Sequence, residues 1–571
     1  MKKSIIFLSI FIISTIVMNA QNVAQTGKKV KDQKVSSDYD RNSMTFYYLD
    51  FNENHSDLVK QKFSSFVVPD KFYDNTLDVK ILKVLKDRAS ITTTSVFAKQ
   101  INTASLDDVL TENKTGQKLI SKWFSRTNGQ FGVDLLKERG MYNATDADYV
   151  VAQASKRGKA ALMDMGMNLV DKSFVLMFDF SNVMTMNEYY EKNKTEAKNR
   201  TSNGFMADVT GYLYKLDFND SVAAVFFQDY WIGENDPNRE SKIKAFESTS
   251  FPLKLVSTFT QPLSASQFNP GQKLAPKTQK SSDQLMQDLV NSGMNGIITK
   301  IENKFDEFRV KAFVTGVRPI TSKIGRKEGL KFDQRYFVYE NIQTNSGETI
   351  TKRKGVVKAI KISDNRDITS GETQPSQFYQ TSGWKIDNYG MFMEQKNAVG
   401  INLFLGLTNT EFTGFAGRAE FYISTLIYEG AVKKGRSGLL SSLHLYIEGG
   451  YDTQENLNTE YNFLKLSAGF GKELYPIPNF HIAPFVGYGL EKANWDNAAD
   501  NKISSQFVEG GVRAGINATY NIQLVGSVNY KFVLFSEEQD KDGTKVMDIT
   551  YDDTFPDRGG IGYSFGIRFM F

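Results

Sequence analysis

The end of the chain alternates between large apolar side chains and small or polar ones. From Ile561 to Phe571 the odd positions carry aromatic or aliphatic residues, whereas the even positions carry Gly, Ser, Arg and one Met. A period of two is typical of a β-strand whose two faces meet different surroundings. A strand of a membrane barrel, with lipid on one side and the barrel interior on the other, has this pattern. The alternative is an edge strand of a soluble β-sandwich.

Seven further segments after residue 393 repeat this alternation. Together with the terminal strand they predict an eight-stranded antiparallel transmembrane β-barrel over residues 393–571. The apolar positions of these seven segments begin at Val399, Phe415, Leu443, Leu464, Ile482, Val508 and Ile522.

The opposite face of the same strands carries charged side chains. The interior of an eight-stranded barrel is just wide enough for side chains to fill. Unpaired charge in that space costs several kcal/mol per ion, so we expect the two signs to pair across a filled lumen. The expected interior charge network consists of Arg418, Glu420, His444, Glu448, Lys465, Glu509, Arg513, Lys531 and Arg568.

The terminal strand also resembles the C-terminal signature of bacterial outer-membrane β-barrel proteins, in which alternating apolar residues end in an aromatic residue. The resemblance implies an outer-membrane protein with its C-terminus on the periplasmic side. Residues 21–392 are then expected in the periplasm, and the connections over 452–460, 491–503 and 536–559 face outward. The last connection is acidic and is a candidate calcium site, with a solvated surface loop as the alternative. The matching residues are Tyr563, Phe565, Ile567, Phe569 and Phe571.

The start of the chain has the pattern of a cleaved signal peptide. Lys2 and Lys3 precede an apolar run from Ser4 to Met18. This run is too short to cross about 30 Å of hydrocarbon as a helix. We therefore interpret residues 1–20 as a signal peptide, with a single membrane anchor as the alternative. Residues 21–42 are polar and Lys-rich, which predicts a disordered segment.

Residues 43–270 mix helical and strand patterns, and we expect them to form one periplasmic α+β domain. A helix is expected over 146–170. Two strands, 206–217 and 222–231, are expected to pair as a hairpin around Asn219-Asp220.

Two smaller regions separate this domain from the barrel. Residues 271–307 predict a linker followed by an amphipathic helix, and residues 308–392 predict a small β-module. Gly329-Leu330, the run YFVYE over 336–340 and Gly355-Val356-Val357 resemble the SH3-like domain that ends the flagellar T-ring assembly protein and related periplasmic proteins. The resemblance implies a binding or assembly module without catalysis.

Composition narrows the possible chemistry. Among 571 residues there is no Cys, which excludes disulfides, thiolate chemistry and a lipid-anchored N-terminal cysteine. The 69 Lys and Arg nearly balance the 65 Asp and Glu, so no nucleic-acid footprint is indicated. His55, His444 and His481 share no metal-ligand spacing with a carboxylate, and we expect neither metal nor cofactor. The one G-x-S-x-G run, residues 562–566, lies inside the terminal strand, whereas a nucleophile elbow needs a strand-to-helix turn.

These patterns favour a non-enzymatic, outer-membrane anchored protein that presents a large periplasmic region. The expected role is a structural or accessory subunit of an envelope assembly or secretion system. Its expected partners are outer-membrane lipid and envelope proteins in the periplasm. One alternative is a small-solute channel or surface receptor. Another is a membrane-tethered periplasmic enzyme with a pocket in residues 43–270.

Overall fold

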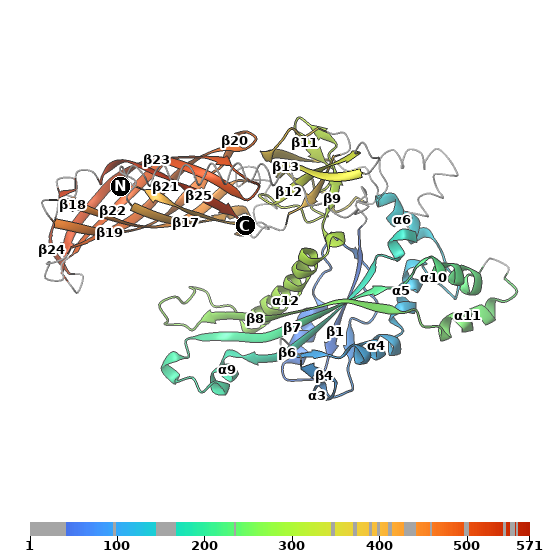
Figure 1. The fold of residues 1–571 in the computed structure, drawn as a ribbon. Coiled ribbons are helices and arrows are strands. Elements are labelled where there is room, and N and C mark those ends of the chain that lie inside the picture. The colour runs from blue at the N-terminus through green and yellow to red at the C-terminus, as the bar shows by residue number, and fades with distance from the viewer. Residues whose placement is uncertain are drawn as a thin grey trace.

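In the computed structural model the chain forms an N-terminal α+β domain, a small β-module and a closed β-barrel (Figure 1). The module lies at the end of the barrel where the C-terminus is marked, and β24 lies at the opposite end (Figure 1). Among the residues described, none of the helices has the length and apolar character needed to cross a membrane. The structure describes residues 41–571 except 95–98, 144–166, 233–235, 344–348, 369–373, 388–390, 397–399, 409–413, 427–440, 457–458, 496–501, 541–543, 549–553 and 556–557.

Several expectations concern residues outside these ranges. The signal peptide expected over residues 1–20, residues 21–40 of the polar segment and most of the helix expected over 146–170 lie outside the described residues.

The N-terminal domain is built on a six-stranded mixed sheet in which β1 pairs in parallel with β6, and β6, β7 and β8 pair antiparallel. β1 is buried along its whole length because helices cover both faces of the sheet. Alternate residues of β1 therefore enter different cores, Phe46 on one side and Tyr47 on the other. The strands are β1 (Ser43–Asp50), β2 (Tyr73–Asp74), β3 (Ile81–Lys83), β6 (Ser173–Thr185), β7 (Ser202–Leu216) and β8 (Leu253–Phe268).

Helices on the two faces of this sheet differ in number and length. The long helix α12 and the short helix α2 cover one face, and several short helices cover the other. A separate β4–β5 hairpin flanks the second group. These elements are α2 (Ser56–Ser64), α3 (Arg88–Ile91), β4 (Thr92–Thr94), β5 (Lys99–Ile101), α4 (Thr103–Glu112), α5 (Thr115–Trp123), α6 (Asp134–Asn143), α9 (Met186–Lys192), α10 (Asp220–Val225), α11 (Arg239–Ser248) and α12 (Ser282–Lys304).

The hairpin expected after β7 is wrong. The first expected strand is present as β7, but the second expected strand is helical: α10 runs into a π-turn over Phe226–Tyr230. The Asn219 side chain accepts hydrogen bonds from the backbone N–H groups of Ser221 and Val222, which caps the helix. The aromatic residues that suggested a strand instead pack into the core beside α5 and α11.

The amphipathic helix expected within residues 271–307 is present as α12 (Ser282–Lys304), and it packs against the N-terminal sheet. Leu289 and Met294 are fully buried against this sheet. Gly211 on β7 allows the close approach, because a Cβ there would lie 2.4 Å from Cγ2 of Ile297. The α+β domain therefore includes α12.

Replacing Leu289 with Ala is expected to destabilise the N-terminal domain by about 2–5 kcal/mol, because it leaves a cavity between α12 and the sheet. Denaturant unfolding of the full chain, followed by tryptophan fluorescence, measures this loss. Ser292→Ala, at an exposed position of the same helix, is the control and is expected to change stability by less than about 0.5 kcal/mol. Equal effects of both variants would contradict the packing of α12 on the sheet.

The β-module is a seven-stranded antiparallel sheet in the order β10-β11-β14-β13-β12-β15-β9. Its core is formed by buried aliphatic and aromatic side chains that include Leu330, Tyr336 and Val357. The strands are β9 (Lys311–Phe313), β10 (Gly316–Val317), β11 (Ile320–Ser322), β12 (Arg335–Gln343), β13 (Thr349–Lys361), β14 (Ser376–Gly383) and β15 (Met391–Gln395).

The eight-stranded antiparallel barrel is confirmed. Its closure depends on two pairings, β16 with β25 and β19 with β21. The strands are β16 (Ile401–Thr408), β17 (Gly414–Tyr422), β18 (Leu443–Asn456), β19 (Thr459–Lys472), β21 (Phe480–Trp495), β22 (Lys502–Asn517), β23 (Ile522–Gln539) and β25 (Gly560–Met570), with α13 (Ile423–Leu426) after β17 and the short strands β20 (Leu474–Ile477) and β24 (Lys545–Asp548) beside the barrel.

All three expected outward connections overlap strands. In the third, residues 536–559, β23 runs to Gln539 and β24 covers Lys545–Asp548. β18 ends at Asn456 and β19 begins at Thr459. β21 ends at Trp495 and β22 begins at Lys502. Most of residues 452–460 and half of 491–503 are therefore strand. These hairpins run beyond the belt of apolar side chains on the outside of the barrel. There the alternation is inverted: Lys492 and Asn494 are exposed, whereas Phe463, Ala493 and Ile503 are buried in a small inner apolar cluster with Phe555.

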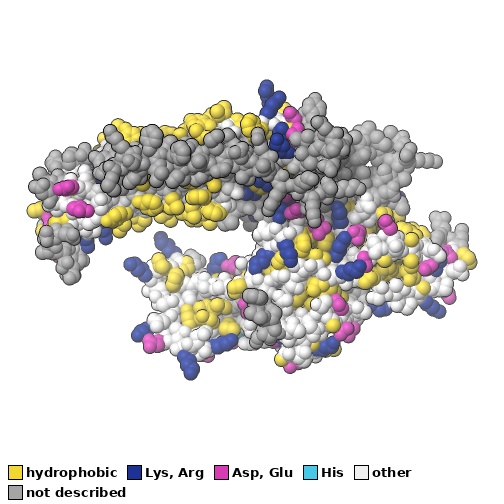
Figure 2. All heavy atoms as spheres, in the orientation of Figure 1, with side chains coloured by type: hydrophobic (Ala, Val, Ile, Leu, Met, Phe, Trp, Pro, Cys, Tyr) yellow, Lys and Arg dark blue, Asp and Glu magenta, His cyan; other side chains and the backbone are white. Residues whose placement is uncertain are grey.

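The outer surface of the barrel carries a belt of exposed apolar side chains. Leu466 is 56% exposed and Tyr530 is 58% exposed. Figure 2 shows hydrophobic side chains along the upper and lower edges of the barrel. The belt includes Leu403, Leu405, Leu407, Phe415, Ile447, Leu464, Leu466, Phe470, Val486, Leu490, Val512, Ile516, Val528, Tyr530, Phe532 and Ile561.

Candidate functional site

The nine charged or His residues expected in the barrel interior all lie at inward-facing positions. Seven of them are buried residues, and the side chains of Glu448 and Lys465 keep exposures of 12% and 17%. Alternation along each strand produces this arrangement, because every second side chain points into the barrel.

Six of these residues form a chain of ion pairs in which the sign of the charge alternates, and we call it the lumen ladder. It begins at Arg568 on β25 and ends at Glu509 on β22, crossing the barrel through β17, β18 and β19. The pairs are Arg568 with Glu420 (2.5 Å), Glu420 with Arg418 (2.8 Å), Arg418 with Glu448 (2.9 Å), Glu448 with Lys465 (3.4 Å) and Lys465 with Glu509 (2.7 Å).

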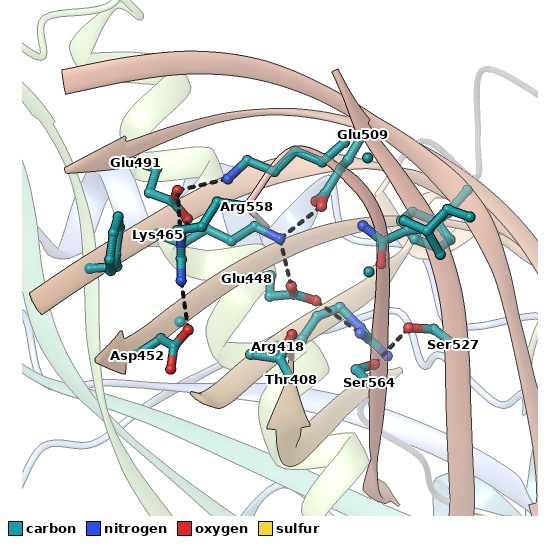
Figure 3. Close-up of a pocket in the computed structure, with 18 of the residues that line it drawn as sticks. Thr408, Arg418, Glu448, Asp452, Lys465, Glu491, Glu509, Ser527, Arg558 and Ser564 are labelled. Carbon is teal, nitrogen blue, oxygen red and sulfur yellow. Dashed lines mark hydrogen bonds and ion pairs between the residues drawn. The ribbon is translucent and has the colours of Figure 1, made fainter. Parts of the chain in front are cut away.

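A second ionic cluster lies beside the ladder and contains residues that the sequence analysis did not include (Figure 3). Glu491 pairs with Lys531 at 2.7 Å and with Arg558 at 2.9 Å, and Arg558 also pairs with Asp452 at 2.6 Å. Glu491 on β21 and Asp452 on β18 occupy positions whose side chains point inward by the alternation of these strands. Extending the alternation by two residues predicts both as interior residues. Arg558 comes from the connection before β25, where no periodic pattern marks it.

Two of the nine expected residues have no carboxylate partner among the described residues. Arg513 stacks on aromatic rings, with its guanidinium carbon 3.7 Å from the ring centre of Phe485 and 4.2 Å from that of Tyr446. His444 is buried beside Tyr422, with 6.3 Å between ring centres. Gly471 leaves room for it, because a Cβ there would lie 2.6 Å from Nε2 of His444.

The space left between these side chains is small. Figure 3 shows residues that line it: four members of the ladder (Arg418, Glu448, Lys465 and Glu509), the second ionic cluster and the hydroxyls of Ser527 and Ser564. The cavity has a volume of about 80 Å³. That volume is enough for a few water molecules. Within the described parts of the chain, no three His, Asp or Glu side chains are arranged to hold a metal ion.

The β-module extends the lumen ladder at the barrel end that it covers. Glu473, directly after β19, contacts Arg568 of the ladder and lies 3.5 Å from Nζ of Lys358 on β13. Lys358 is 2% exposed and also donates a 2.8 Å hydrogen bond to the hydroxyl of Tyr422 on β17. Burial opposes the charge on Lys358, but the nearby Glu473 carboxylate raises the pKa of this lysine above its ordinary value. One lysine of the module thus continues the alternation of charge out of the barrel.

Further buried polar contacts hold the module on the same end of the barrel. Asp333 of the module accepts hydrogen bonds from the hydroxyl of Ser424 at 2.6 Å and from the backbone N–H of Ser442 at 2.8 Å. The backbone of Gly383 donates to Asn479 Oδ1 at 2.7 Å and accepts from Asn479 Nδ2 at 3.0 Å. Gly383 has φ +101, and a Cβ there would lie 2.2 Å from the carbonyl oxygen of Lys354, so this contact requires glycine. The module and the barrel therefore form one packed unit.

The aromatic and aliphatic residues of the terminal-strand pattern lie on the outer face of β25, except Phe571, which directly follows it. Tyr563, Phe565 and Phe571 are exposed, and Ile567 and Phe569 are half-buried. They continue the outer apolar belt, while Arg568 between them points inward to the lumen ladder.

No family model and no curated protein matches this chain. Among solved structures, the barrel is similar to a major outer membrane protein from Thermus thermophilus, with 15% identity over 30% of this chain and 99% of that chain, and a TM-score of 0.20. It is also similar to Neisserial surface protein A, with 12% identity over 31% of this chain and 100% of that chain, and a TM-score of 0.20. A third is the N-terminal β-barrel domain of Pseudomonas aeruginosa OprF, with 13% identity over 31% of this chain and 100% of that chain, and a TM-score of 0.19.

Proposed function

We propose that the protein is anchored in the bacterial outer membrane by its barrel, with the module and the α+β domain in the periplasm. The outer belt supports this, because monomeric soluble proteins rarely expose apolar patches larger than a few hundred Å². A membrane strand needs about 9–11 residues. β21, β22 and β23, with 16, 16 and 18 residues, exceed that length.

We further propose that the role is non-enzymatic: the barrel anchors the periplasmic units as a structural or accessory part of an envelope assembly. The observation that carries this proposal is the lumen ladder, which fills the barrel and continues through Glu473 to Lys358 of the module. A barrel that is filled and covered in this way suits anchoring better than transport. The resemblance of the module to SH3-like assembly domains points in the same direction and stays a prediction.

Asp179, one of the buried carboxylates of the α+β domain, makes contacts that suit a structural role. Asp179 on β6 pairs with Nη1 of Arg88 at 2.7 Å, and Nε of Arg88 pairs with Glu53 at 2.7 Å. Burial raises the pKa of Asp179, against the opposing effect of Arg88. A general base needs access to a substrate proton, whereas this carboxylate is 4% exposed and already paired. The pairing favours a structural role over the enzyme alternative.

The anchoring role is tested by cross-linking in intact envelopes. A reactive cross-linker applied to cells, followed by purification of the full chain in detergent, is expected to recover a reproducible envelope protein linked to residues 43–304. Recovery of no envelope protein at all would contradict the proposed role. Links that lie only on the outer connections would favour a surface receptor instead.

The purified protein is expected to show no conductance in a planar lipid bilayer, because the remaining lumen cavity holds only a few water molecules. The measurement is the single-channel current under an applied potential, with a known porin in the same bilayer as the positive control. Stable conductance steps that scale with protein concentration would contradict the filled lumen and favour the small-solute channel.

A further inference from the structure

Three cationic side chains gather around one aromatic pair where the module meets the barrel rim. The pair is Phe337 on β12 and Tyr520 in the turn between β22 and β23, with ring centres 6.1 Å apart. The guanidinium carbon of Arg353 lies 3.7 Å from the ring centre of Phe337 and 5.4 Å from that of Tyr520. Nζ of Lys396 lies 5.5 Å from the ring centre of Phe337, and Nη1 of Arg335 donates to the carbonyl oxygen of Tyr520 at 3.5 Å. We call Arg335, Arg353 and Lys396 the rim cluster.

No carboxylate described in the structure forms an ion pair with the rim cluster. The cluster contacts neutral groups instead: the hydroxyl of Tyr339, which is 3.3 Å from Arg353, and the side-chain oxygen of Asn521, which Lys396 contacts. Burial, together with the charges of Arg335 and Arg353, lowers the pKa of Lys396 to about 7. The cations of the lumen ladder, by contrast, each have a carboxylate partner. The cluster is therefore a concentration of positive charge that an anion would stabilise.

The rim cluster lies directly beyond the apolar belt. Ile516, the last strongly exposed apolar residue of β22, is 59% exposed and precedes Tyr520 by four positions. At the same end of the barrel, Trp384 is 77% exposed and follows Gly383, which is bonded to the β20–β21 turn. Exposed Trp is typical of the boundary between membrane and water. Lipid headgroups occupy the layer next to the hydrocarbon, so this layer meets the rim cluster.

We infer that the rim cluster binds the phosphate group of an anionic phospholipid in the leaflet that faces the module. Guanidinium groups present paired N–H donors that match phosphate oxygens, and a lysine adds a point charge. A lipid fits better than free phosphate because its acyl chains would cover the belt residues beside Tyr520. The inference rests on the proposed membrane location of the barrel. It adds a specific lipid contact that also bridges the module and the barrel.

Chemical protection of Lys396 tests this inference in the full chain purified in detergent. A lysine with a lowered pKa reacts readily with acetic anhydride near neutral pH, and a bound anion blocks that reaction. The probes are dihexanoylphosphatidylglycerol, dihexanoylphosphatidylcholine and inorganic phosphate at equal concentrations. Peptide mass spectrometry measures acetylation at Lys396. We expect phosphatidylglycerol to slow acetylation at least fivefold, and the other two probes to slow it less than twofold.

Variants separate the cluster from general charge effects. Arg353→Gln changes an exposed position of the cluster. In this variant we expect about tenfold more phosphatidylglycerol to be needed for the same protection of Lys396. Lys273→Gln with Lys277→Gln, at exposed positions outside the rim cluster, is expected to leave protection unchanged. Equal protection by phosphatidylcholine would overturn the preference for an anionic lipid. Equal protection by inorganic phosphate would overturn the assignment to a lipid. Equal protection by phosphatidylcholine or by phosphate contradicts only the lipid site. The membrane location itself would be contradicted by a protein that stays monodisperse without detergent.

Discussion

Replacing Glu473 with Gln is expected to loosen the β-module from the barrel and to cost about 3–5 kcal/mol of folding free energy. Glu473 is the carboxylate that joins Lys358 of the module to Arg568 of the lumen ladder, and all three side chains are almost fully buried. Without its charge, Lys358 and Arg568 remain in a dry interior with weaker partners. Denaturant unfolding in micelles measures the energetic cost, and limited proteolysis at the module–barrel junction measures the loosening.

Two companion variants make this result interpretable. Glu455→Gln, at an exposed position of β18, removes the same charge outside the buried network and is expected to change stability by less than about 0.5 kcal/mol. Glu473→Gln combined with Lys358→Met is expected to cost less than the sum of the two single variants by about 0.5–3 kcal/mol, because the partners are lost together. Strict additivity would show that the two residues do not interact.

Replacing Leu466 with Arg is expected to destabilise the barrel by about 2–4 kcal/mol, because the proposed membrane location puts this outward position near the middle of β19 against lipid. Leu466 is 56% exposed and borders Leu490 on β21, so in water the same change would be harmless. Reversible unfolding in lipid vesicles measures the effect. Leu274→Arg is the control, since Leu274 is 71% exposed but lies outside the barrel. Equal, near-zero effects at both positions would show that the belt faces water.

The sequence predicted the barrel well because the belt imposes a strict period of two. Inside the belt, every apolar position fixes the direction of its neighbours, so Arg418, Glu420 and Glu448 could be assigned to the interior without any structure. Beyond the belt the apolar residues change to the inner face, where Phe463, Ala493 and Ile503 are buried together, so an apolar outer face no longer marks the strand. The sequence pattern therefore places Asp452 and Glu491 in connections, although they are paired inside the barrel.

Residues that act through contacts between distant segments could not be predicted in the same way. Lys358 lies in a strand of the module whose pattern suggests an ordinary solvated lysine, and only the docking of the module buries it. Arg558 enters the barrel from a connection without periodicity. The aromatic run after Asn219 predicts a strand by propensity, but the Asn219 cap and the core beside α5 favour a helix.

The pairing of Arg568 with Glu420 and Glu473 has a consequence for how the barrel forms. Arg568 is on β25, whereas its partners come from β17 and from the residue after β19, so each pair spans the seam where β25 meets β16. Neither pair can form before the circle of strands is complete. Intermediates with an open seam must keep water around Arg568, and expelling that water is favourable only at closure. Closure of the barrel should therefore be cooperative, with the two ion pairs and the last strand pairing forming together.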